Sequence, residues 1–223
     1  MIVFMCFIIL VYSAHIPIIY SQSAQEYFKN GKVQAQSGNF NEAITSFSMA
    51  IKLKNDFADA YLHRGDAAKM SGNYQVAIKD YTRVIKLDPG NYIGYFKRAI
   101  VHSLLKNYSD ALNDYNIALE RDPDNSSILC GRGCMKYLIK DYVGSITDLN
   151  KAIDKDSTYE VLYLTRGIVK EEQGDYPGAV SDYNKALVLK PDLSIAAYLN
   201  GLVLRKMYLQ NKPVGSNVQV KEE

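Results

Sequence analysis

Residues 58–91 read ADAYLHRGDAAKMSGNYQVAIKDYTRVIKLDPGN. The stretch contains two apolar-periodic segments, Ala58–Ser71 and Tyr74–Leu87, with a Gly-Asn turn between them. In the second segment the apolar side chains recur at helical spacing, so they form one stripe along a helix. The Asp-Pro pair at 88–89 ends this segment, because the residue before a proline disfavours helical geometry. The stretch therefore predicts two helices joined by a tight turn.

The pattern of residues 58–91 recurs every 34 residues without a gap. A shift of the chain by 34 residues superposes an aromatic residue in five places, namely Phe40, Tyr74, Tyr108, Tyr142 and Tyr176. The five units that follow are 24–57, 58–91, 92–125, 126–159 and 160–193. A period of this length is typical of a solenoid built from stacked helical repeats.

The five units resemble the tetratricopeptide repeat family. That family has a large residue at repeat position 4, Gly or Ala at 8, Ala at 20, an aromatic residue at 24, Ala at 27 and Pro at 32. The second unit matches with Tyr61, Gly65, Ala77, Tyr81 and Pro89, and has Val84 in the place of the alanine. The fifth unit matches with Tyr163, Gly167, Ala179, Tyr183, Ala186 and Pro191. The fourth unit diverges most, with Leu129, Ser145, Leu149 and Ser157. The resemblance implies an all-α, right-handed α-solenoid of five helix-turn-helix repeats.

The residues after 193 begin a sixth unit without completing it. Residues 194–209 supply a first helix with Gly201 at the repeat's glycine position, and Arg205 and Lys206 make one side polar. A solenoid needs such a capping helix, because its last repeat otherwise exposes an apolar face. Residues 210–223 contain Pro213, Gly215 and several charges, so we expect a disordered tail there.

The composition excludes several classes of protein. Hydrophobic residues make up 48% of the chain and charged residues 22%, which is too apolar for a disordered protein. The net charge of +2 gives no reason to expect a nucleic acid as partner. Three cysteines cannot form a disulfide scaffold.

The N-terminal segment 1–23 contains no charged residue, although the rest of the chain contains 50 of them. Its apolar run followed by small residues favours a cleaved signal peptide, with cleavage after Ser23 or Ala24 and a site near Ser13 as an alternative cleavage site. An uncleaved membrane anchor is the alternative, and a misassigned start codon is a third. A signal peptide or an anchor would deliver the repeats outside the cytoplasm, as a periplasmic or secreted protein, and an anchor would be the only membrane attachment.

An arginine at position 7 and an aspartate at position 23 recur in the last four units. They are Arg64, Arg98, Arg132 and Arg166, with Asp80, Asp114, Asp148 and Asp182. The first unit lacks both, having Asn30 and Ser46 instead, so the two residues behave as a pair. We expect a structural ladder of ion pairs, formed within a repeat or across to the next one. A row of ligand-binding arginines is the alternative.

No arrangement of residues predicts catalysis. The sequence has no Walker loop, GxSxG elbow, HExxH motif or paired CxxC. Cys130 and Cys134 lie one helical turn apart, but two ligands do not make a zinc site, and a disulfide at this spacing is strained. We expect free thiols, no metal and no cofactor, with a thiol-dependent enzyme as the remote alternative.

The family resemblance implies a concave groove lined by first-helix positions 2, 5, 6, 9, 12 and 13. Carried over, these positions place Phe96, Ile100, Leu104, Cys130, Cys134, Tyr137, Leu164 and Ile168 in the groove. In the fourth unit the groove positions 2, 5, 6 and 9 all carry small residues, whereas the neighbouring units have bulkier ones. The small residues are Ser127, Cys130, Gly131 and Cys134. We therefore expect a dry recess there that receives a side chain of the partner.

Two functions are consistent with these observations. The first is a non-enzymatic scaffold of an extracytoplasmic compartment that binds a peptide or helix of a partner protein. The second is an accessory subunit or assembly factor of an envelope or secretion complex.

Overall fold

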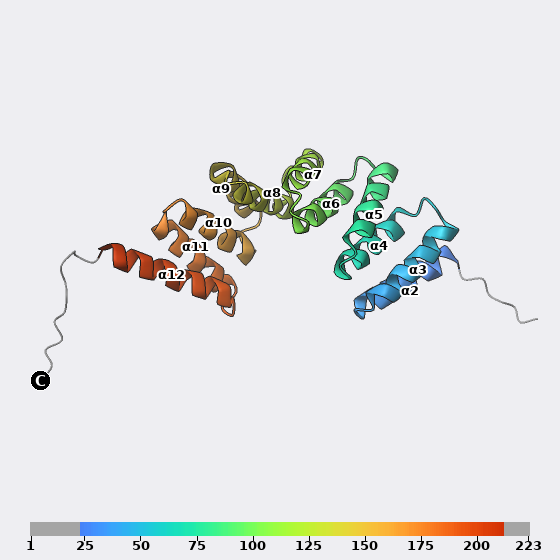
Figure 1. The fold of residues 1–223 in the computed structure, drawn as a ribbon, viewed down its shortest axis with the longest axis horizontal. Helices are drawn as coiled ribbons and strands as arrows, with labels where there is room; N and C mark the ends of the chain where they lie inside the picture. The colour runs from blue at the N-terminus through green and yellow to red at the C-terminus, as the bar shows by residue number, and fades with distance from the viewer. Residues whose placement is uncertain (1–22, 212–223) are drawn as a thin grey trace, which may run out of the picture.

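The computed structural model describes residues 23–211, so the predicted signal segment 1–22 and the residues 212–223 of the predicted tail lie outside it. The described residues form helices only, and consecutive helices pair through short turns, which confirms the predicted all-α repeat array (Figure 1). The first helices of the five repeats are α2 (Ala24–Gln36), α4 (Ala58–Met70), α6 (Tyr92–Leu104), α8 (Ser126–Leu138) and α10 (Glu160–Glu172). The second helices are α3 (Phe40–Leu53), α5 (Tyr74–Leu87), α7 (Tyr108–Arg121), α9 (Tyr142–Lys155) and α11 (Tyr176–Leu189). The capping helix α12 (Ser194–Asn211) ends two residues beyond the predicted Leu209.

Each turn between the two helices of a repeat contains one residue in the left-handed region. Three repeats place a glycine there, with φ between 79° and 81°. The third and fourth repeats place Lys106 and Lys140 there instead, with φ of 61° and 66°. The next residue is an Asn or Asp that begins the second helix; the Asp141 side chain, for example, accepts a hydrogen bond from the Gly144 amide. The turn geometry is therefore common to all five repeats, although only three have the glycine that favours it.

The array is an arch with α2 and α12 at its two ends (Figure 1). Each first helix packs against the second helix of its own repeat and that of the preceding repeat. First helices of neighbouring repeats also contact one another, as α6 does with α8 and α8 with α10, and no comparable contact joins the described second helices. The first helices therefore line the inner, concave side of the arch.

The glycine of the first helix and the aromatic residue of the second helix pack as a unit. A Cβ atom on Gly65 would lie 2.7 Å from the Tyr81 ring, and one on Gly167 would lie 2.6 Å from the Tyr183 ring. Both rings are fully buried. The absence of a side chain at the glycine thus lets the two helices of a repeat enclose a large ring between them.

The third repeat departs from this arrangement. Ala99 takes the place of the glycine, and the aromatic residue Tyr115 packs instead against Gly131 of the fourth repeat, where an added Cβ would lie 2.6 Å from its ring. The fourth repeat has the glycine, Gly133, but covers it with Leu149 rather than an aromatic ring. The ring of Tyr115 therefore lies at the boundary between two repeats, near Phe96 of its own repeat and against Gly131 of the next.

Candidate functional site

The recurring arginines and aspartates meet within each repeat. The Arg98 Nε and Nη2 atoms each donate to one carboxylate oxygen of Asp114, at 2.8 Å. The remaining nitrogen, Nη1, donates across the repeat boundary to the Thr82 hydroxyl at 3.0 Å. The other three arginines bind in the same way, each to the aspartate sixteen residues ahead and to a Ser or Asn sixteen residues behind. We call these four pairs the Arg/Asp ladder.

The contacts of the Arg/Asp ladder indicate that its role is structural. Asp114 is 2% exposed, so its charge is removed from water and depends on the bidentate contact with arginine. The hydrogen bonds to Asp114 raise the pKa of Arg98 above its ordinary value. Since all three nitrogens of the guanidinium group already bind the protein, the alternative of a ligand-binding arginine row has no support in this geometry.

Two aspartates of the ladder have a second cationic partner. The Lys136 Nζ atom lies 2.9 Å from Asp148, and the Lys170 Nζ atom lies 2.8 Å from Asp182. Sequence reasoning missed these lysines, although each stands four residues after its arginine, a spacing that puts both side chains on one helix face. The other two aspartates rely on arginine alone.

The eight predicted groove residues lie on the first helices α6, α8 and α10, and their exposure differs. Leu104 is 53% exposed and begins a row along the concave side of the arch. Phe96, Ile100, Cys134, Tyr137, Leu164 and Ile168 are half-buried. Cys130 is only 8% exposed and belongs to the core. Leu138, beside Tyr137, is 45% exposed and adds to the apolar surface.

The predicted recess in the fourth repeat is wrong. The ring of Tyr115 lies over Gly131 and fills the space that the small residues were expected to leave open. The Phe96 ring in turn lies 6.2 Å from the Tyr115 ring. The expectation of a recess considered first-helix positions only, so it did not include the ring of Tyr115, which lies on the second helix of the preceding repeat.

The two cysteines of α8 are free thiols. The hydrogen bond with Cys134 and burial raise the pKa of Cys130 far above its ordinary value. Cys130 therefore supplies little thiolate, which is the reactive form, whereas the hydrogen bond with Cys130 lowers the pKa of Cys134. Within residues 23–211, no group of three or more His, Cys, Asp or Glu side chains is placed to hold a metal ion.

Charged residues stand at both ends of the apolar row. At the N-terminal end, Lys29 and Lys32 border a hollow of about 390 Å³ along α2. At the C-terminal end, Glu172 borders a smaller hollow of about 230 Å³ that Tyr137 and Leu138 also line. Each hollow also has a residue of the opposite charge on its lining, Glu26 at the first and Lys140 at the second.

Comparison with known proteins supports this description of the fold. A TPR repeat model matches residues 31–72, and a tetratricopeptide repeat model matches residues 58–91. No curated protein matches the sequence. Among solved structures, MamA (residues 41 to the end) from Desulfovibrio magneticus RS-1 has a TM-score of 0.69 and 19% identity, covering 76% of this chain and 96% of that one.

Two further solved structures are similar. A tetratricopeptide repeat protein from Parabacteroides merdae has a TM-score of 0.72 and 19% identity, covering 87% of this chain and 82% of that one. YrrB, described as a TPR protein with an unusual peptide-binding site, has a TM-score of 0.65 and 15% identity, covering 80% of this chain and 92% of that one. The match to tetratricopeptide repeat models is thus confined to residues 31–91, and the whole array shares the fold of these solved structures. Proteins built from tetratricopeptide repeats are generally non-enzymatic and bind protein partners.

Between residues 23 and 211, no helix is long and apolar enough to cross a bilayer.

Proposed function

We propose that the concave surface of α6, α8 and α10 binds an extended or helical segment of another protein. The observation that carries this proposal is the row of apolar side chains on the inner side of the arch, where Leu104 is 53% and Leu138 45% exposed. Neither leucine is needed to close the core of its own repeat. Exposed apolar side chains gathered along a concave surface are typical of a site that a partner covers.

Two lysines on α2 offer the partner a place for an acidic residue. Lys29 and Lys32 take part in no ion pair of the described array, and Lys32 lies 5.8 Å from the Phe28 ring centroid. An acidic residue of the partner would be stabilised there, while apolar anchors contact α6, α8 and α10. The peptide-binding site attributed to YrrB supports a peptide ligand for a fold of this kind.

A random peptide library displayed on phage tests the proposed groove, because it samples many partner sequences at once. Selection against the purified protein should enrich sequences with apolar anchors, and Leu138→Glu should abolish their binding. The matched control is Val143→Glu, because Val143 is 74% exposed but lies on the second helix α9. Selected peptides that bind the two variants equally well would contradict the groove. Circular dichroism of both variants establishes that the repeats remain folded.

We also propose that segment 1–23 directs export, as its lack of charged residues predicts. The structure bears on where cleavage would occur. The Ser23 side chain caps α2 by accepting from the Glu26 amide, and the Glu26 carboxylate accepts from the Ser23 amide at 2.7 Å. Cleavage after Ser23 would remove this cap and cost the first helix about 1 kcal/mol. N-terminal sequencing of the native protein gives the site, and a chain that begins at Met1 in the cytoplasm would contradict export.

A further inference from the structure

Within residues 23–211, no second helix of its own repeat packs over the capping helix α12. In the complete repeats that have a glycine at position 8, this glycine lies against a side chain of the second helix. A Cβ atom on Gly201, by contrast, would meet no atom within 4 Å, whereas one on Gly167 would meet the Tyr183 ring at 2.6 Å. The end of the array therefore presents an open surface that has the shape of an interface within a repeat.

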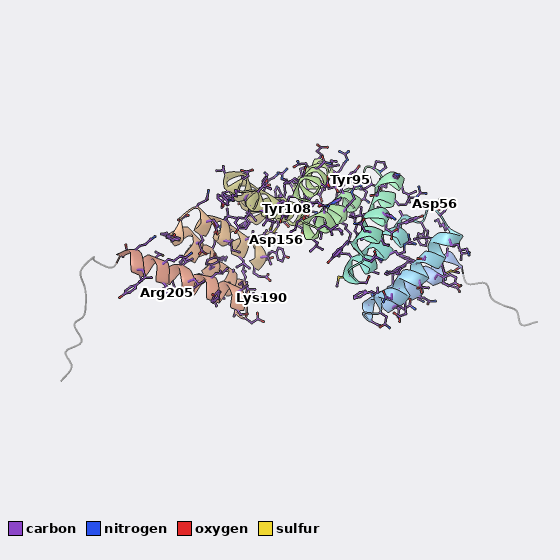
Figure 2. The ribbon with its side chains drawn as sticks, viewed as in Figure 1. Asp56, Tyr95, Tyr108, Asp156, Lys190 and Arg205 are labelled. Carbon is purple, nitrogen blue, oxygen red and sulfur yellow. The ribbon has the colours of Figure 1, made fainter. Side chains whose placement is uncertain are left out.

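This open surface is strongly apolar. Of the fourteen large hydrophobic side chains that are exposed in residues 23–211, α12 alone supplies five, which makes it the densest apolar patch on any described helix. They are Ile195, Tyr198, Leu204, Tyr208 and Leu209. The one charged side chain near the middle of the surface is Arg205, labelled on α12 in Figure 2. Lys206 points elsewhere, because its Nζ atom lies 2.6 Å from Glu171.

The surface is also complementary to itself. Tyr198 is 64% exposed and stands three residues before Gly201, so one helix carries both a projecting ring and a position without a side chain. The repeats show how the two fit, since a tyrosine ring over a glycine is how Tyr183 packs on Gly167. A two-fold axis requires this property, because the same patch must meet its own copy.

We propose that α12 pairs with α12 of a second copy of this chain, antiparallel, about an axis between Tyr198 and Gly201. Each Tyr198 ring then covers the Gly201 of the other copy, and Ile195 meets Leu204. Antiparallel pairing also brings Arg205 to the N-terminal end of the opposite helix, where Asp192 is exposed. The single cation of the surface thereby gains an anionic partner.

The experiment is sedimentation velocity of the mature protein, purified from its host, over a range of concentrations. The wild type should dimerise, and Tyr198→Lys should weaken dimerisation at least tenfold. The control is Val188→Lys, because Val188 is 73% exposed on α11, outside the surface of α12, and should leave the dimer unchanged.

A charge exchange tests the antiparallel geometry itself with two exposed residues that the fold does not need. Arg205→Asp should weaken dimerisation, because it places like charges opposite one another, and adding Asp192→Arg in the same chain should restore it. A monomer at every concentration, a dimer that tolerates Tyr198→Lys, or a failure of the exchange to restore association would overturn the proposal. So would a monomer whose α12 surface is covered by a different protein.

Discussion

Replacing Arg98 with Ala tests how the array is held together. The substitution leaves Asp114, which is 2% exposed, without the two hydrogen bonds of 2.8 Å that neutralise it. Breaking a buried ion pair by removing one partner costs about 3–5 kcal/mol. Because the Arg98 side chain is itself 21% exposed, water reaches part of the site, and we expect a loss near the lower bound, about 3 kcal/mol.

Double-mutant cycles then identify the partner of Arg98. Arg98 and Asp114 should show a coupling energy of about 2 kcal/mol, since residues in direct contact couple by about 0.5–3 kcal/mol. Arg98 and Thr82 should couple by about 1 kcal/mol, the contribution of a single hydrogen bond. Arg98 and Asp80 share no hydrogen bond, so their effects should add. The measurement is urea denaturation followed by circular dichroism at the helical band.

The fourth repeat provides an internal comparison. Asp148 keeps the Lys136 Nζ atom at 2.9 Å when Arg132 is removed, so Arg132→Ala should cost clearly less than Arg98→Ala. Equal losses for the two arginines would refute the role given to Lys136. Additive effects of Arg98 and Asp114 would refute the Arg/Asp ladder as the source of the stability.

Three further predictions concern single side chains. Lys106→Gly and Lys140→Gly should each raise the free energy of unfolding by up to about 1 kcal/mol, because both lysines have a positive φ that glycine adopts without strain; unchanged denaturation midpoints would contradict this. Gly167→Ala should lower stability by about 1 kcal/mol or more, since its Cβ atom would lie 2.6 Å from the Tyr183 ring; a stabilised variant would show that helix propensity dominates. Burial raises the pKa of Tyr115 to about 12, so the unfolded chain loses this proton first and stability should fall as the pH rises from 10 to 12. Tyr115→Phe should make that fall less steep, as measured by denaturation at several pH values.

Most of the fold was predictable because each repeat contains its own local signals for where its helices begin and end. The 34-residue period, the turn before each second helix and the proline after three of them all indicate the same helix boundaries. Even the turns with Lys106 and Lys140 follow the common geometry, since the surrounding repeat outweighs the cost of a positive φ at lysine. In a repeat sequence, several local signals thus agree on the same helix boundaries.

The contacts between repeats were harder to predict. Arg98 is sixteen residues from Asp114 and eighteen from Asp80, and both spacings join a first helix to a second helix, so only the structure distinguishes them. The groove positions came from the family resemblance. It indicates which side of a first helix faces the groove, but not which of those side chains a neighbouring residue buries. For that reason Cys130 was placed in the groove, although it is buried, and the recess beside it was expected to be open.

The position of the Tyr115 ring limits how the repeats of the array can be rearranged. In the second and fifth repeats the ring packs on a glycine of the same repeat, so this contact is kept when either repeat is duplicated or exchanged. The third and fourth repeats are not separable in this sense, because the Tyr115 ring of the third packs over Gly131 of the fourth. Inserting a standard repeat between them would leave one ring without its cavity and one glycine without its cover. Any rearrangement of the repeats therefore has to move the third and fourth repeats as one unit.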